Sequence, residues 1–243
     1  MILAAGLGTR LRPLTDTVPK ALVTVSGRTL LAHVVARLQQ SGFERIVINV
    51  YHRAQQIVDY LEQQHNFGLD LVVSDESGQL LETGGGVKRA RRLLNGSSPL
   101  LVHNVDIFSN ADLSALYASV QHGDDAALLV SSRTTQRYLL FDDDQRLKGW
   151  TNVATGQVKS PGPLQEPLSQ YRRLAFSGIH VLSPRLFPLM DEWPDRFSII
   201  DFYLSVCGRS RIMAHEQPGL RLLDVGKPDA LVEAAHFLQD LGG

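Results

Sequence analysis

Residues 29–50 have the sequence TLLAHVVARLQQSGFERIVINV, in which a helical pattern passes into a strand pattern. Apolar residues three and four positions apart form one stripe over residues 29–41, at Leu30, Leu31, Val34, Val35 and Leu38. Gly42 follows, where a helix commonly ends. Residues 46–50 are an apolar run rich in β-branched side chains, which favours a strand. We therefore expect a helix that leads into a buried strand.

The same alternation extends in both directions. Residues 2–5 form a short apolar run, and after residue 50 helical patterns over 54–64 and 85–94 alternate with apolar runs over 69–73 and 100–102. Strands that alternate with helices need crossover connections, which predicts a mainly parallel sheet with helices on both faces. Such sheets bind ligands at the carboxyl ends of their strands. Gly6 and Asp106 each follow a predicted strand, so we expect both at that edge.

The second half of the chain has a different pattern. A helix candidate over 112–122 precedes strand runs over 126–130, 138–141 and 175–182, and helical patterns return over 184–190, 199–207 and 228–241. The polar stretch between Trp150 and Arg173 is expected to form loops or a flap. We predict one α/β domain over residues 1–243. Its sheet is Rossmann-like, mainly parallel but mixed, and flanked by helices, with a small substrate-facing lobe inserted at roughly 132–182.

Composition bears on location and partners. The formal net charge of −1 gives no general attraction to nucleic acid or to an anionic membrane. The one cysteine, Cys207, cannot form an internal disulfide, which suits a reducing cytoplasm. No apolar run approaches the ~20 residues of a membrane-spanning helix, and the first residues lack the features of a signal peptide. We expect a cytoplasmic protein with no nucleic-acid or membrane partner, and predict no oligomeric state.

A strand end followed by a glycine loop carries most of the chemistry: LAAGLGTRLRPLT at residues 3–15, then PKAL at 19–22. Gly6 and Gly8 let backbone N–H groups approach an anion, and Arg10 and Lys20 add positive charge. A triphosphate needs both kinds of contact. The pattern is neither a P-loop nor a dinucleotide fingerprint, because no Gly-Lys-Ser/Thr follows and the third glycine is missing. The glycines alone leave a tight turn with two solvated cations as the alternative.

Taken whole, this segment resembles the signature of the sugar-1-phosphate nucleotidyltransferases, Gly-x-Gly-Thr-Arg-Leu-x-Pro-Leu-Thr followed by Pro-Lys-x-Leu. The resemblance implies that the loop wraps a nucleoside triphosphate through Ala4, Ala5, Gly6, Leu7, Gly8, Thr9 and Arg10. It also implies that Arg10 and Lys20 are catalytic. Arg10 would lie on the β and γ phosphates, and Lys20 would bridge the α-phosphate and the incoming sugar phosphate.

A second stretch is implied to contact the nucleotide. Residues 82–86, Glu-Thr-Gly-Gly-Gly, precede a predicted helix and resemble the family's small-residue stretch beside the base. We expect nucleotide contacts from Glu82, Thr83, Gly84 and Gly85, with the glycines leaving room for the base against the backbone. A simple glycine loop is the alternative. Asn104, at the end of a predicted strand, is assigned to both nucleotide and sugar.

Two aspartates are expected to bind Mg²⁺. Asn104-Val105-Asp106 resembles the family's Asn-Gly-Asp, and residues 224–228, Asp-Val-Gly-Lys-Pro, resemble its Asp-Val-Gly-Thr-Pro. Carboxylates are hard oxygen ligands that suit this ion. The resemblance therefore implies Asp106 and Asp224 as metal ligands. Val105 departs from the family's glycine and is expected to narrow the space near the sugar or to shift the backbone.

The sugar is expected to lie against the inserted lobe. Phe-Ser-Gly-Ile at residues 176–179 resembles the strand that lines the family's sugar pocket, which implies contacts from Ser177 and Gly178. The family's Glu-Lys-Pro has a weak match in Gln165-Glu166-Pro167. Glu166 is assigned to the sugar, but no lysine follows it, and Lys159 is the candidate for the missing charge.

We expect the chain to join a nucleoside triphosphate, with UTP favoured, to a sugar 1-phosphate and to release pyrophosphate. Its motifs look most like those of bacterial uridylyltransferases that act on N-acetylmuramate 1-phosphate in cell-wall recycling. Guanylyltransferases of mannose or heptose 1-phosphate are the alternative. Two more distant alternatives remain. One is a glycosyltransferase with its metal at Asp142, Asp143 and Asp144, and the other is a non-catalytic nucleotide-sugar sensor.

Overall fold

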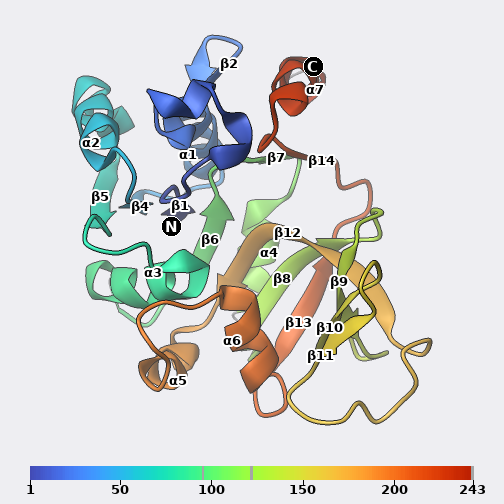
Figure 1. Cartoon of the computed structure of the whole chain (residues 1–243). Helices are drawn as coiled ribbons and strands as arrows, with labels where there is room; N and C mark the ends of the chain where they lie inside the picture. The colour runs from blue at the N-terminus through green and yellow to red at the C-terminus, as the bar shows by residue number, and fades with distance from the viewer. Residues whose placement is uncertain (95, 121–122, 242–243) are drawn as a thin grey trace.

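The computed structural model describes residues 1–94, 96–120 and 123–241, and a large mixed sheet lies at its centre (Figure 1). The strands of this sheet are β1 Ile2–Leu3, β4 Arg45–Val50, β5 Asp70–Asp75, β6 Leu100–Asn104, β8 Ala126–Ser131, β9 Arg137–Phe141, β10 Leu147–Asn152, β11 Gln157–Lys159, β12 Arg172–Leu182 and β13 Ile212–Glu216. Their order is β11-β10-β9-β12-β6-β1-β4-β5, and β8 pairs with both β12 and β13.

Four strands make the parallel part of the sheet. β6, β1, β4 and β5 run in the same direction, with β1 between β4 and β6. This is the arrangement that the strand–helix alternation predicts, because each crossover helix returns the chain to the same edge. The ends of β1 and β6 therefore bring the glycine loop and Asp106 to one edge of the sheet. The predicted fold class is confirmed.

The other part of the sheet is mainly antiparallel. β12 runs antiparallel to β6, to β8 and to β9, and β10 pairs with β9 and β11 in the same sense. The polar stretch expected to be loops thus contains the end of β10 and all of β11, whose residues 157–159 are all exposed. Figure 1 shows these lobe strands on the side of the sheet away from β4 and β5.

Helices cover both faces of the sheet. They are α1 Leu30–Gln40, α2 Ala54–Gln63, α3 Glu82–Ala90, α4 Leu113–Ser119, α5 Phe187–Asp191, α6 Ile199–Val206 and α7 Pro228–Leu241. Side chains of α1, α2, α4 and α7 pack in one core with Ile46 and Ile48, whereas α3, α5 and α6 pack in a second core with Val47. Successive side chains of β4 therefore point to opposite faces of the sheet and pack into two different cores. None of the described helices is long and apolar enough to span a bilayer.

Some boundaries differ from the sequence expectation. The helix expected over 112–122 is α4, which begins after its N-cap Asp112 and ends at Ser119, and residues 121–122 lie outside the described residues. Three strands of the large sheet, β10, β11 and β13, were not predicted, nor were the short strands β3 Arg28–Thr29, β7 Ile107–Ser109 and β14 Leu222–Asp224. A further short strand, β2 Thr24–Val25, lies within the apolar run 22–25. Strands of two or three residues are too short for a periodic pattern, and they form because of the partner that tertiary structure supplies.

Candidate active site

The glycine loop leaves β1 and folds back through three single turns, at Thr9–Leu11, Leu14–Asp16 and Lys20–Leu22. Gly8 has a φ of +65°, and a Cβ there would lie 2.9 Å from Thr15 Cγ2 and 3.0 Å from Lys20 Cβ. The Thr15 hydroxyl donates to Gly8 O at 2.8 Å. Gly8 is thus required both by its backbone conformation and by the close approach of the segment that carries Lys20. A side chain at Gly6, in contrast, would meet open space.

The two predicted metal aspartates lie side by side. β7 pairs with β14 so that Ile107 faces Asp224, and the Val225 N–H donates to Asp106 O at 2.8 Å. The Gly226 N–H donates to Asp224 Oδ1 at 2.8 Å, which orients that carboxylate. This two-stranded pairing is therefore the element that joins Asp106 to a residue from the far end of the chain.

Each aspartate faces one of the two predicted catalytic cations. Lys20 Nζ forms an ion pair with Asp106 Oδ2, and these side chains are only 12% and 13% exposed. Arg10 Nη1 lies 3.9 Å from Asp224 Oδ2, and these side chains are 55% and 46% exposed. The structure thus brings the four residues together as two pairs, one enclosed and one open to solvent.

The donor set fits Mg²⁺ carried by a triphosphate. Within the described ranges, no cluster of three or more His, Cys, Asp or Glu side chains is placed to hold a metal. Mg²⁺ is commonly held by one or two carboxylates, with phosphate oxygens and waters in the other positions. Asp106 and Asp224 match that pattern, and they would leave the remaining positions to the substrate.

The predicted sugar strand, β12, contacts Asn104 at the end of β6. Gly178 has a φ of +81°, and a Cβ there would lie 2.6 Å from Asn104 Nδ2. The buried Ser177 hydroxyl accepts from the Ile179 N–H at 3.2 Å. Glu166 is exposed in the loop before β12, and its N–H donates to the Tyr171 hydroxyl at 3.2 Å. The contacts of the described residues bring Asn104 and Gly178 together, but they do not bring Glu166 to them.

The sequence placed residues 82–86 before a helix, but in the structure they belong to the helix. They form the first turn of α3, because the helix begins at Glu82. The N–H groups of Gly84 and Gly85 lie 2.9 and 3.2 Å from Phe197 O, and Ile199 N–H donates to the Thr83 hydroxyl at 2.9 Å. Glu82 pairs with Arg196 at 3.0 Å. A glycine-rich first turn has no apolar stripe, so periodicity could not locate this start.

The packing of α3 gives Gly84 and Gly85 a second role. A Cβ at Gly84 would overlap the Phe197 ring, and one at Gly85 would overlap Asp195 O. The glycines therefore let α3 approach the segment before α6, whereas the sequence analysis explained their small size by room for a base. Any side chain at either position would point toward Phe197 or Asp195.

Gly85→Ala is expected to destabilise the fold by about 1–3 kcal/mol, because the added methyl group overpacks a buried contact. Urea unfolding followed by circular dichroism measures the change. Gly78→Ala is the matched control, since a Cβ at Gly78 meets nothing within 4 Å. Equal stability of the Gly85→Ala and Gly78→Ala proteins would contradict this account of the packing.

Sequence reasoning missed a buried chain of hydrogen bonds between the glycine loop and the start of α3, the two segments predicted to contact the nucleotide. Asn49 accepts from the Ala4 N–H at 2.7 Å and donates to Glu76 Oε1 at 2.7 Å, and Glu76 Oε2 accepts from the Leu81 N–H at 3.1 Å. Glu76 is 1% exposed, and this burial raises the pKa of its carboxyl above the ordinary value. Asn49, a polar residue inside the apolar run 46–50, was the available signal.

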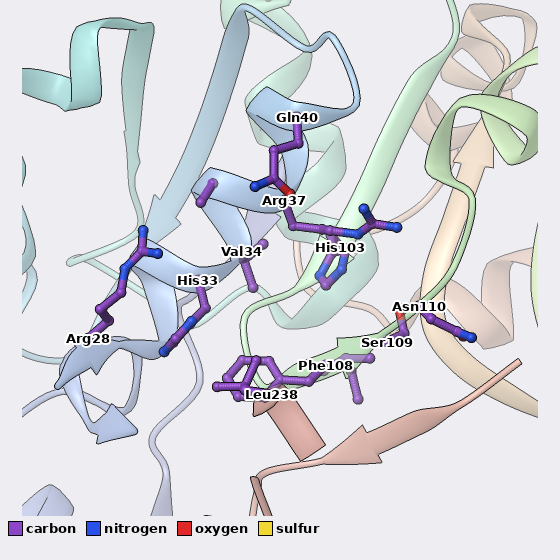
Figure 2. Close-up of a pocket in the computed structure, with 12 residues that line it drawn as sticks. Arg28, His33, Val34, Arg37, Gln40, His103, Phe108, Ser109, Asn110 and Leu238 are labelled. Carbon is purple, nitrogen blue, oxygen red and sulfur yellow. The ribbon is translucent and has the colours of Figure 1, made fainter. Parts of the chain in front are cut away.

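A separate cavity of about 430 Å³ lies between α1, β7 and α7. Figure 2 shows His33 and Arg37 of α1 on one side of it, and Phe108 and Leu238 on another. His103 also lines it, and burial lowers the pKa of this histidine to about 4, so that it is neutral near pH 7. None of the residues predicted to bind nucleotide, sugar or metal is among its lining residues, so this cavity is not the candidate active site.

Comparison with known proteins identifies the class of this site. The family model described as nucleotidyl transferase matches residues 1–138, which include the glycine loop, Lys20 and Asp106. The chain therefore belongs to the nucleotidyl transferase family, within the sugar-1-phosphate nucleotidyltransferases that its motifs resemble. Membership makes it an enzyme, as the sequence predicted.

Two relatives are N-acetylmuramate alpha-1-phosphate uridylyltransferases. The one from Caulobacter vibrioides is 32% identical over 240 residues, which cover 96% of this chain and 94% of the relative. The one from Neisseria meningitidis serogroup B is 44% identical over 187 residues, 77% of this chain and 76% of the relative. Among solved structures, HddC from Yersinia pseudotuberculosis in complex with GMP-PN matches with a TM-score of 0.76 at 23% identity. The match covers 98% of this chain and 97% of that chain, which shows a common fold.

Proposed function

We propose that this enzyme transfers a uridylyl group from UTP to a sugar 1-phosphate in the presence of Mg²⁺ and releases pyrophosphate. The observation that carries the proposal is the pairing of Lys20 with Asp106 and of Arg10 with Asp224 at the ends of β1 and β6. The two uridylyltransferase relatives support UTP and favour N-acetylmuramate 1-phosphate as the acceptor. The same relationship supports a cytoplasmic role in recycling cell-wall sugar.

The reaction needs charge and position rather than proton transfer. An oxygen of the sugar phosphate attacks the α-phosphorus in line, the bond from that phosphorus to the bridging oxygen breaks, and pyrophosphate leaves with the electron pair. A phosphate monoester is already an anion at pH 7, so it needs no general base. The site must hold two anions in contact and stabilise charge on phosphate oxygens.

The chain's own residues can meet those needs. Lys20, enclosed beside Asp106, would lie between the α-phosphate and the sugar phosphate. Arg10 makes only a 3.9 Å solvent-exposed contact with Asp224, so its guanidinium is available to the leaving phosphates. Asp106 and Asp224 would hold Mg²⁺, which supplies further neutralisation of the phosphate charge when it is bound.

The glycosyltransferase alternative places its metal at Asp142, Asp143 and Asp144. Asp142 begins the turn between β9 and β10, where Oδ1 accepts from the Arg146 N–H at 2.8 Å and Oδ2 pairs with Lys148 at 3.0 Å. The acidic run thus forms a turn between two strands, and its sequence of three aspartates between two strand runs also favours a turn. Its first carboxylate is already used within the turn, which favours the nucleotidyltransferase function.

The test is pyrophosphate release from each of the four nucleoside triphosphates with several sugar 1-phosphates. We expect UTP with N-acetylmuramate 1-phosphate to give the highest kcat/KM. Highest activity with GTP and mannose or heptose 1-phosphate would favour the guanylyltransferase instead. No pyrophosphate from any pair, with folded protein and Mg²⁺ present, would contradict the proposal.

A further inference from the structure

The lobe contains a cavity of about 560 Å³ outside the residues that the family motifs mark. It lies between β9, β10, β12 and the start of α6, and Figure 1 shows these elements in the lower right part of the molecule. Its lining includes the aromatic rings of Trp150 and Phe176 and the cations Arg133, Arg137 and Lys159, beside uncharged polar and aliphatic side chains. One carboxylate, that of Asp201, is among the lining residues.

The charges of this cavity do not cancel. Lys159 Nζ pairs with Asp201 Oδ1 at 2.8 Å and lies 5.4 Å from the centre of the Trp150 ring. Arg133 donates from Nη2 to Phe176 O at 3.1 Å, a contact that leaves its charge uncompensated. In the described part of the chain, neither Arg133 nor Arg137 has a carboxylate within ion-pairing distance. Both arginines are exposed, so their charges are hydrated in the free protein and accessible to an anionic ligand.

The cavity adjoins the sugar end of the candidate active site. Phe176 lines it, and Gly178, which packs on Asn104, follows two positions later on the same strand. Two residues of any chain span at most about 7 Å, and the positive φ of Gly178 keeps this stretch shorter than a regular strand. A group that extends from a sugar beside Asn104 and Gly178 could therefore reach the cavity. The cavity therefore lies next to the predicted sugar site, and none of its lining residues belongs to the glycine loop.

We propose that this cavity binds a carboxylate carried by the sugar 1-phosphate, and that Arg133 and Arg137 select sugars that bear one. This inference rests on the proposed function, and it assigns the class of sugar. Guanidinium groups match carboxylates in paired hydrogen bonds, and the aromatic walls suit the carbon atoms between ring and carboxylate. A neutral sugar such as mannose would gain no ionic contact from either guanidinium group.

The experiment compares sugars that differ only in this group. N-acetylmuramate 1-phosphate carries a lactyl carboxylate, its lactyl methyl ester has nearly the same size without the charge, and N-acetylglucosamine 1-phosphate lacks the group. The readout is the ratio of kcat/KM for the acid to kcat/KM for its ester. In the Arg133→Gln/Arg137→Gln double variant we expect this ratio to fall about ten- to a hundredfold, since hydrogen bonds to charged groups are lost.

The control is Arg172→Gln, an exposed arginine of the same lobe that pairs with Glu216 and does not line the cavity. Its ratio should equal that of the parent. An unchanged ratio in the double variant would overturn the proposal, whether activity falls equally for all three sugars or not at all. An equal fall would assign the arginines to the 1-phosphate. If the double variant does not fold, the two single variants decide.

Failure of the proposed function gives a different result. A parent enzyme without activity on any sugar 1-phosphate would count against that function and not by itself against this cavity. Calorimetric titration with N-acetylmuramate 1-phosphate and with its methyl ester then tests the cavity directly. Binding of the acid that is no tighter than binding of the ester would overturn the inference.

Discussion

A Lys20→Met enzyme is expected to turn over at least about a hundredfold more slowly than the parent, as is typical when one preorganised electrostatic contact in an active site is lost. Methionine keeps most of the buried side-chain volume and removes the charge beside Asp106. The measurement is pyrophosphate release at saturating substrates, with thermal unfolding to show that the variant is folded. Stability needs this check, because Asp106 is left enclosed without its partner.

Arg12→Ala is the matched control for this prediction. Arg12 is a cation of the same loop, but it is mostly exposed and pairs with Asp16 at 3.3 Å rather than with a metal-site aspartate. Its loss should change turnover little, since exposed ion pairs contribute little. Turnover near that of the parent in a folded Lys20→Met enzyme would remove Lys20 from the reaction and weaken the whole assignment.

Asp106→Asn and Asp224→Asn are each expected to reduce kcat/KM by at least about a hundredfold, and the double variant should be little worse than the more severe single one. The reason is the pairing of β7 with β14, which brings the backbones of the two aspartates together, so that both carboxylates could hold one metal ion and act as one unit. Effects within such a unit are not additive. Raising the Mg²⁺ concentration should restore a single variant in part, because one carboxylate remains.

The control here is a triple variant, Asp142, Asp143 and Asp144 all changed to Asn. These residues form the turn between β9 and β10, so most activity should remain. A triple variant without activity beside an active Asp224→Asn enzyme would reverse the assignment and favour the glycosyltransferase. Activity losses of Asp106→Asn and Asp224→Asn that multiply in the double variant would show that the two carboxylates act separately.

Elements set by local sequence patterns were predicted well, whereas contacts between residues far apart in the sequence were not. The stripe of α1 and the apolar run of β4 are local patterns, and both elements were predicted within one or two residues. The proximity of Asp106 to Asp224 was implied only by family motifs, because no local pattern indicates that β7 pairs with β14.

Other features could not be predicted for the same reason. The small size of Gly84 and Gly85 is explained by a segment more than a hundred positions later. Arg133 and Arg137 line one cavity because β10, β12 and α6 supply its other walls. The sequence analysis assigned the glycines to the nucleotide base, with a simple loop as the alternative, and did not single out the arginines. Both depend on which surfaces tertiary structure brings into contact.

In the candidate active site, each predicted metal-binding aspartate is paired with a cation of the chain: Asp106 with Lys20, and Asp224 with Arg10. A metal–triphosphate complex would replace the enclosed Lys20–Asp106 ion pair, with Asp106 passing to the metal and Lys20 to a phosphate, whereas the exposed contact of Arg10 with Asp224 is weak. Metal alone would compete with Lys20 for Asp106, and nucleotide alone would compete with Asp106 for Lys20. Each ligand therefore relieves the competition that the other meets, and by linkage each raises the affinity of the other.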